Sequence, residues 1–227
     1  MSLREKQTAT RRRQMLDAAE ALIRQTGGTD FSMRILAEAA EVSPATPYNF
    51  FGSKEGLLFA LLQRTLEAFL SQGLVFSSDD PYEQALEAAE NAVDLLLGDT
   101  VVMRPLYQVM LALTDPLHHP LFIKGAFEFY RGATQGLLNA GRLKDANEQD
   151  TFAFALMAHF IGVLNLWVQE DIGDEYFRAQ VMLGFVQLLW ALSDSPPPAL
   201  TNKLEQLKRT LRSNKFKPAF FSTKKSG

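Results

Sequence analysis

Apolar residues recur at helical spacing along nearly the whole chain. Near the N-terminus, Met15, Ala19 and Ile23 repeat every four residues, and the pattern stops at Gly27, a residue typical of helix C-caps. We find no run of alternating apolar and polar residues bounded by turn dipeptides, which is the usual signal for a strand. The pattern therefore predicts an all-α fold.

Helix starts are predicted from capping residues and prolines. Ser32 is a good N-cap for a short helix over residues 33–40, and Ser53 caps a long helix that ends near residue 72. Further starts are predicted at Pro81 (helix to about residue 97), Pro105, Pro120, Asn147 with Asp150 (to about residue 170) and after Gly173 (to about residue 192).

A short polar segment, VSPATPYNFFGSKEGL (residues 42–57), separates two strongly helical stretches. Ser43 is suited to cap a helix, Pro44 to occupy its first turn, and Gly52 to end it. About seven residues span roughly 10 Å, which fits across a B-DNA major groove of about 12 Å. Two short helices joined by a tight turn predict a helix-turn-helix unit, whose second helix reads base edges.

The residue types in this segment suggest a division of labour on DNA. Thr46 and Asn49 offer hydrogen bonds to bases, while Tyr48 and Lys54 are suited to phosphates. Tyr48 also fits a half-buried packing role, and the basic run at residues 11–13 fits either an arm on DNA or a solvated segment. The predicted DNA-contacting set is Arg11, Arg12, Arg13, Ser32, Arg34, Ser43, Pro44, Ala45, Thr46, Tyr48, Asn49 and Lys54.

The stretch FSMRILAEAAEVSPATPYNFFGSKEGLL (residues 31–58) resembles the DNA-binding signature of the TetR family of bacterial transcriptional regulators. It departs from the family pattern at Glu41, where the family has a turn glycine, and at Pro47, inside the predicted recognition helix. The resemblance implies an N-terminal three-helix helix-turn-helix domain followed by a larger helical ligand-binding and dimerisation domain. It also implies a homodimer formed by the last two long helices and a near-palindromic double-stranded DNA operator.

Charge is distributed unevenly and supports three segments. The expected boundaries are 1–53 for the DNA-binding domain with a basic N-terminal arm, 54–195 for the ligand-binding and dimerisation domain, and 196–227 for a basic C-terminal tail. Residues 65–195 carry 6 Lys and Arg against 18 Asp and Glu, whereas residues 196–227 carry 8 against 1. Residues 200–212 fit a short basic amphipathic helix, and we expect the tail to be solvated, although its basic residues also fit nonspecific phosphate contacts.

The acidic, aromatic middle of the chain is where the resemblance implies a ligand cavity, at about residues 81–170. Pockets in helical bundles are apolar with a few polar anchors, although aromatic residues at helical spacing also fit an ordinary core. The candidate lining residues are Tyr107, Met110, Phe127, Tyr130, Arg131, His159 and Asn165. The adjacent histidines at 118–119 do not share a helix face, so we expect no metal site and no cofactor.

The sequence is compatible with three functional hypotheses. The first is a ligand-responsive repressor that releases its operator on binding a small apolar or aromatic effector. The second is a constitutive or partner-controlled regulator, and the third is an all-α enzyme, which the lack of a catalytic constellation disfavours. The chain has no Cys, and we expect no secretory signal, no membrane-spanning segment and a cytoplasmic location.

Overall fold

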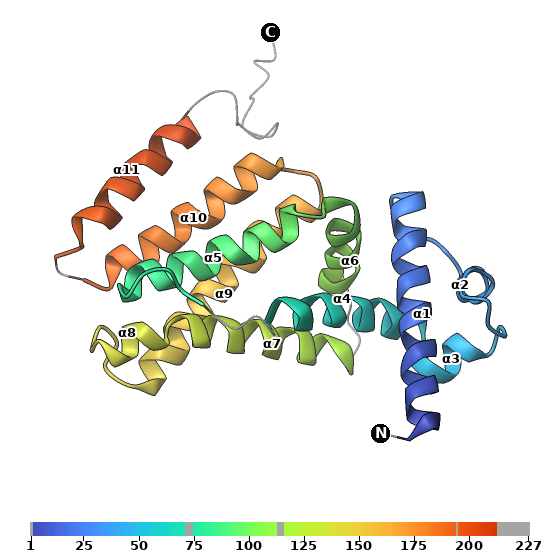
Figure 1. The fold of residues 1–227 in the computed structure, drawn as a ribbon. Coiled ribbons are helices and arrows are strands. Elements are labelled where there is room, and N and C mark those ends of the chain that lie inside the picture. The colour runs from blue at the N-terminus through green and yellow to red at the C-terminus, as the bar shows by residue number, and fades with distance from the viewer. Residues whose placement is uncertain (1, 71–74, 113–115, 194, 213–227) are drawn as a thin grey trace, which may run out of the picture. The chain divides into compact units, whose positions relative to one another are not determined.

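The computed structural model describes residues 2–70, 75–112, 116–193 and 195–212. These residues form helices and no strand (Figure 1), which confirms the all-α prediction. The helices are α1 (Leu3–Thr26), α2 (Met33–Ala39), α3 (Thr46–Phe51), α4 (Lys54–Leu70), α5 (Pro81–Leu97), α6 (Thr100–Ala112), α7 (His118–Ala133), α8 (Gln135–Asn139), α9 (Ala146–Val168), α10 (Asp174–Ala191) and α11 (Pro198–Arg212).

The chain divides into two compact units. The first comprises residues 1–73 and 99–119 and holds α1 to α4 and α6, and the second comprises residues 74–98 and 120–227. The first unit thus extends beyond residue 53, where we expected the DNA-binding domain to end. It does so because α4 contacts both α1 and α6.

Helix α1 is longer than the sequence pattern suggested. The Ser2 hydroxyl accepts from the Glu5 N–H, and the Glu5 carboxylate accepts from the Ser2 N–H, a reciprocal capping box that starts the helix at Leu3. Residues 2–14 are exposed, and burial begins at Met15. The predicted arm ahead of the helix is therefore wrong, because its residues are already helical.

Ion pairs connect three helices of the first unit. Arg64 of α4 contacts Asp17 at 2.5 Å and Glu20 at 2.6 Å, both on α1. Arg24 of α1 contacts Glu20 at 2.8 Å and Asp99, just before α6, at 2.5 Å. The Arg24 guanidinium donates hydrogen bonds to the carboxylates of Asp99 and Glu20, and these bonds, the one to Asp99 first, raise the pKa of Arg24. Because these side chains are part-exposed, the network mainly fixes the orientation of the helices.

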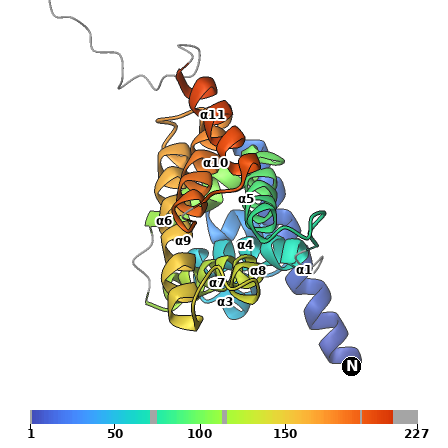
Figure 2. The same ribbon diagram turned by 90° about the vertical axis from the view of Figure 1, so that its left-hand side faces the viewer.

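Helix α10 forms the centre of the second unit. It contacts α5, α9 and α11 and lies among them in Figures 1 and 2. Phe177, Val181 and Phe185 are completely buried along it. Trp167 of α9 stacks on Phe177 at 5.1 Å and donates its indole N–H to Asp174 at 2.7 Å. These contacts anchor the end of α9 to the start of α10.

Most predicted helix boundaries in the second unit are confirmed. The Asp80 carboxylate caps α5 by accepting from the N–H of Tyr82 and of Glu83, and Pro81 is the first helical residue. Helix α10 follows Gly173 as predicted, and α9 starts after Asp145 rather than at Asn147. In the first unit, the start predicted at Pro105 is wrong, since this residue lies inside α6.

The C-terminal segment is only partly the solvated tail that we expected. Its first half is α11, which packs on α10 and buries Leu200 and Leu204. Lys203 forms an ion pair with Glu90 of α5 at 3.1 Å. The helix expected over residues 200–212 is therefore confirmed, whereas the expected solvation is wrong for Leu200, Lys203 and Leu204, and residues 213–227 lie outside the described part of the chain.

Helix α9 corrects the expectation that no segment has the length and apolarity of a membrane span. Among the described residues, its 23 residues alone meet that test as a single helix, with a mean hydropathy of 1.7 over an 18-residue window. Half of that window is buried within the protein. Core helices of soluble proteins pass the same test. One apolar face of α9 packs on α10, and a second carries exposed apolar residues.

The fold makes Gly56, in the first turn of α4, a sensitive position. A Cβ atom there would overlap the Phe51 carbonyl oxygen at the end of α3. We expect Gly56→Ala to lower the free energy of unfolding by about 1–3 kcal/mol, because backbone must move. Gly125→Ala in α7 is the matched control, because open space surrounds that site. Thermal and urea unfolding measure both, and equal stability of the two variants would contradict this packing constraint.

Candidate nucleic-acid interface

The helix-turn-helix unit begins with α2. The Ser32 hydroxyl accepts from the Ile35 N–H at 3.2 Å, which confirms the predicted cap. Leu36 and Ala37 are buried, whereas Arg34 is exposed on the opposite side. Helix α2 is thus held by its apolar face, and Arg34 remains available to solvent.

The turn after α2 is closed by a residue in the left-handed region. Glu41 has φ of 53°, and the Val42 N–H donates to the Ala37 carbonyl at 2.9 Å. A non-glycine residue in this conformation carries strain of about 1–3 kcal/mol. Glu41 thus adopts the positive φ that a glycine would take at this position without strain.

Helix α3 starts two residues later than predicted. The Ser43 hydroxyl lies 2.8 Å from the Thr46 hydroxyl, and the Thr46 N–H donates to the Ser43 carbonyl, so Ser43 and Pro44 form a turn before the helix. Pro47 is then in the first turn of α3 and is buried. Its missing N–H would have no intrahelical partner at that position, so Pro47 does not weaken the helix.

The N-terminal half of α3 and the turn before it form an exposed face. Tyr48 is 54% exposed. Ser43, Pro44, Ala45 and Asn49 are exposed as well, and Thr46 is half-buried. Five of the predicted contact residues are thus accessible at one end of a short helix. We call these residues, with Thr46, the α3 face.

The junction between α3 and α4 fixes the orientation of this face. Gly52 has φ of 74°, and its N–H donates to the Tyr48 carbonyl at 2.8 Å. The Ser53 hydroxyl accepts from the Gly56 N–H at 3.1 Å, as predicted for the cap of α4. Lys54 places its ammonium 5.4 Å from the centre of the Phe31 ring, so its aliphatic part is held against the protein.

The three adjacent arginines of α1 point in different directions around a helix. Arg11, Arg12 and Arg13 are all exposed. The Arg12 guanidinium lies 5.4 Å from the centre of the Phe51 ring, which connects α1 to the last residue of α3. The sequence reading missed this pairing, because neither residue type nor spacing indicates that the two would meet.

The seven candidate pocket residues do not all share one environment. Tyr107, whose pKa is raised by burial, and Met110 belong to the first compact unit. The other five belong to the second. The ring centres of Tyr130 and His159 lie 5.7 and 6.1 Å from the centre of the Phe185 ring.

The remaining three candidates differ in exposure and in contacts. Arg131 is half-buried and contacts Asp150 at 2.7 Å, and this hydrogen bond raises the pKa of Arg131. Phe127 is half-buried and Asn165 is exposed. Among the described residues, no group of three or more His, Asp or Glu side chains is arranged to hold a metal ion.

An all-helical chain with a short, exposed second helix after a tight turn belongs to the class of helix-turn-helix proteins. Residues 15–61 match the profile of bacterial regulatory proteins, tetR family. The HTH-type transcriptional regulator BetI of Brucella anthropi is 39% identical over 56 residues, a segment that covers 25% of this chain and 29% of that regulator.

Solved structures agree in fold. A TetR transcriptional regulator from Rhodococcus sp. RHA1 superposes with a TM-score of 0.62 at 20% identity, covering 82% of this chain and all of that one. SmeT, the repressor of the Stenotrophomonas maltophilia multidrug efflux pump SmeDEF, superposes with a TM-score of 0.59 at 22% identity, covering 79% and 89%. The DNA-binding segment at residues 15–61 thus matches the TetR family, and the chain shares its fold with solved TetR-family regulators.

The conformation of Glu41 leads to a stability prediction. Glu41→Gly should raise the free energy of unfolding by about 1 kcal/mol, because glycine adopts a positive φ without strain. Glu38→Gly, inside α2, is the control and should lower stability by about 1 kcal/mol. Urea unfolding of the two variants distinguishes these opposite signs, and a loss of stability in Glu41→Gly would argue against strain at the turn.

Proposed function

We propose that this chain is a cytoplasmic, DNA-binding transcriptional regulator that represses from a near-palindromic operator. The observation that carries the proposal is the exposed α3 face, presented on a six-residue helix. Such a helix is about 9 Å long and fits within a major groove about 12 Å wide. The match of residues 15–61 to the tetR family profile favours a regulator over an all-α enzyme.

Direct binding tests this function. The chain should bind the DNA just upstream of its own coding region more tightly than unrelated DNA of equal length, as measured by fluorescence anisotropy. Binding should weaken steeply as salt rises, because phosphate contacts release counterions. Equal affinity for both fragments would count against an operator-specific role.

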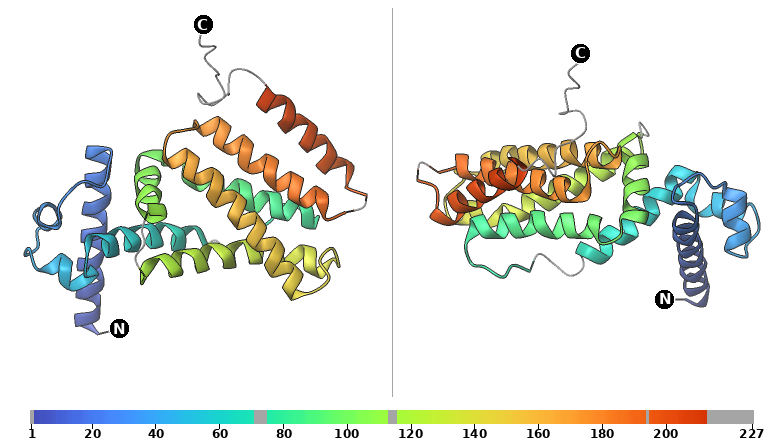
Figure 3. Two further views of the ribbon diagram at one scale, coloured as in Figure 1. Left: turned by 180° about the vertical axis from the view of Figure 1, so that it is seen from behind. Right: turned by 90° about the horizontal axis from the view of Figure 1, so that it is seen from above.

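We further propose a homodimer formed by α9 and α10. Phe154 is 58% exposed, Leu166 37% and Trp190 43%, although all three are large and apolar. Gly162 is surrounded by open space. Seen from behind in Figure 3, α9 and α10 lie on the near side of the second unit. Dimeric helix-turn-helix proteins bind two half-sites about one DNA turn, roughly 34 Å, apart, so a twofold contact through this face would suit the proposed near-palindromic operator.

The proposed effector is a small apolar or aromatic molecule bound in the second unit. A ligand changes DNA affinity only through its different affinity for the two states of the protein. The alternative, a constitutive or partner-controlled regulator, is favoured by the packing around Tyr130, where Phe160 and Phe185 both lie at 5.7 Å. In the anisotropy assay, release of operator DNA by an added effector would support the ligand-responsive regulator. Unchanged binding with every effector tested would support the constitutive or partner-controlled regulator.

Substitutions in the α3 face and at Lys54, the first residue of α4, should separate phosphate contacts from base contacts. Tyr48→Ala and Lys54→Ala should weaken binding to all sequences alike, and Lys54→Ala should reduce the salt slope by about 1. Asn49→Ala and Thr46→Ala should instead change base preference by about 1–3 kcal/mol at single positions. Lys144→Ala, an exposed lysine of the second unit, is the control. Equal, sequence-independent losses for all four variants would contradict this division.

The dimer proposal predicts the effect of a single charge in the apolar face. Phe154→Glu should shift the chain to a monomer in analytical ultracentrifugation, because an unpaired carboxylate would be buried between subunits. It should also weaken operator binding, since each monomer would offer one α3. Leu121→Glu, at an exposed leucine of α7, should leave the oligomeric state unchanged. A Phe154→Glu protein of unchanged mass would rule out this face.

A further inference from the structure

A hollow of about 320 Å³ lies between α1 and α4, within the first unit. Each helix contributes residues at spacings of three, four and seven, so each presents one continuous stripe to the hollow. The lining residues are Ala9, Arg12, Arg13 and Leu16 from α1, and Ala60, Gln63, Arg64 and Glu67 from α4. The hollow therefore shares no residue with the α3 face.

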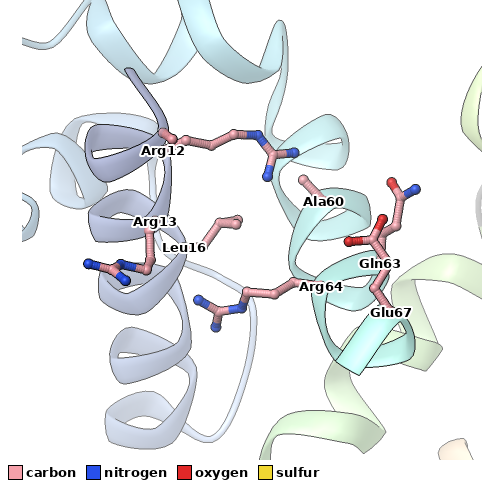
Figure 4. A pocket seen from close by; sticks show the side chains of 8 residues that line it. Arg12, Arg13, Leu16, Ala60, Gln63, Arg64 and Glu67 are labelled. Atoms are coloured by element: carbon pink, nitrogen blue, oxygen red, sulfur yellow. The ribbon is translucent and has the colours of Figure 1, made fainter. Parts of the chain in front are cut away.

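The lining combines the guanidinium groups of Arg12 and Arg64 and an apolar floor with the amide of Gln63 and the carboxylate of Glu67. In Figure 4, Arg12 extends from α1 toward α4 and Arg64 extends from α4 toward α1, with Leu16 and Ala60 between them. Arg13 extends away from α4 in the same view. An apolar surface between cationic groups suits a molecule with an apolar body and an anionic head.

The two arginines differ in their availability. Arg64 already contacts the carboxylates of Asp17 and Glu20. Within the described part of the chain, Arg12 has no carboxylate within ion-pair distance. Its guanidinium lies over the Phe51 ring. A guanidinium binds carboxylate or phosphate oxygens through two parallel hydrogen bonds. Arg12 is thus the anchor for an incoming anion.

We propose that this hollow is a binding site for a small amphipathic anion, with its carboxylate or phosphate head on Arg12 and its apolar body on Leu16 and Ala60. Occupancy also weakens DNA binding, because Arg12 contacts the last residue of α3 and the anion adds negative charge beside the DNA. This second step rests on the proposed function, whereas the first does not.

The fluorescent anion 1-anilinonaphthalene-8-sulfonate (ANS) tests the site in the full-length chain without DNA. Arg12→Gln should weaken a saturable component of ANS binding by about tenfold, since a charge-assisted bond is lost. Ala9→Leu should weaken it similarly by filling the hollow, and both positions are exposed, so folding is preserved. Arg209→Gln on α11 and Gln7→Leu on α1, outside the lining, are the matched controls.

Neutral and competing probes define the head group. N-phenyl-1-naphthylamine, which lacks the sulfonate, should bind equally to the wild type and to Arg12→Gln. Octanoate or octyl phosphate should displace ANS, and their order identifies a carboxylate or a phosphate as the preferred head, whereas octan-1-ol should not displace it. Unchanged ANS affinity in both Arg12→Gln and Ala9→Leu, or displacement by octan-1-ol equal to that by octanoate, would overturn the proposal.

The regulatory step has its own readout. Saturating octanoate or octyl phosphate, whichever displaces ANS more strongly, should lower operator affinity about tenfold in the wild type and have no effect in Ala9→Leu. Equal inhibition of both proteins would overturn the regulatory step. A chain that binds ANS through Arg12 but binds no operator would retain the anion site and refute the proposed function instead.

Discussion

The close approach of α4 to the end of α3 sets the geometry on which the DNA-binding unit depends. Gly56 lies against the Phe51 carbonyl oxygen, so even a methyl group would push the two helices apart. A six-residue helix is too short to be stable alone, so tertiary contacts fix the position and orientation of α3. Buried Pro47 and the Arg12 contact with Phe51 fix it from two further sides. The exposure of the α3 face follows from this fixed orientation.

The same unit joins its helices by charge. The pair of Arg64 with Glu20 connects α4 to α1, and Arg24 of α1, which also contacts Glu20, extends the network to Asp99 just before α6. Surface ion pairs contribute little stability individually, but a shared carboxylate restricts the relative rotation of the helices that it connects. Any ligand that draws on these arginines therefore acts on the orientation of α4, and with it on α3.

Local signals explain which parts of the fold could be predicted from the sequence. The caps at Ser32, Ser53 and Asp80 are satisfied within three residues, so the helices after them were placed correctly or within one residue. The start of α3 was misplaced because the Ser43 hydroxyl bonds the Thr46 hydroxyl instead of a backbone N–H. The capping box of Ser2 and Glu5 was visible in the sequence and would have corrected the supposed arm. The meeting of Arg12 with Phe51 depends on tertiary packing, and no local pattern encodes it.

Helix α9 shows why composition alone leaves its role open. Gly184 of α10 is a glycine because the His159 ring of α9 occupies the space of a side chain, and the His159 Nε2 lies 3.1 Å from the Gln180 carbonyl. Gly162 of α9 faces open space, beside exposed Leu166 and Asn165. Gly184 therefore allows close packing within the subunit, whereas Gly162 leaves the exposed surface of α9 flat. An exposed amide on that surface would be costly against hydrocarbon but acceptable against a protein, so the uncovered side of α9 fits a protein partner better than lipid.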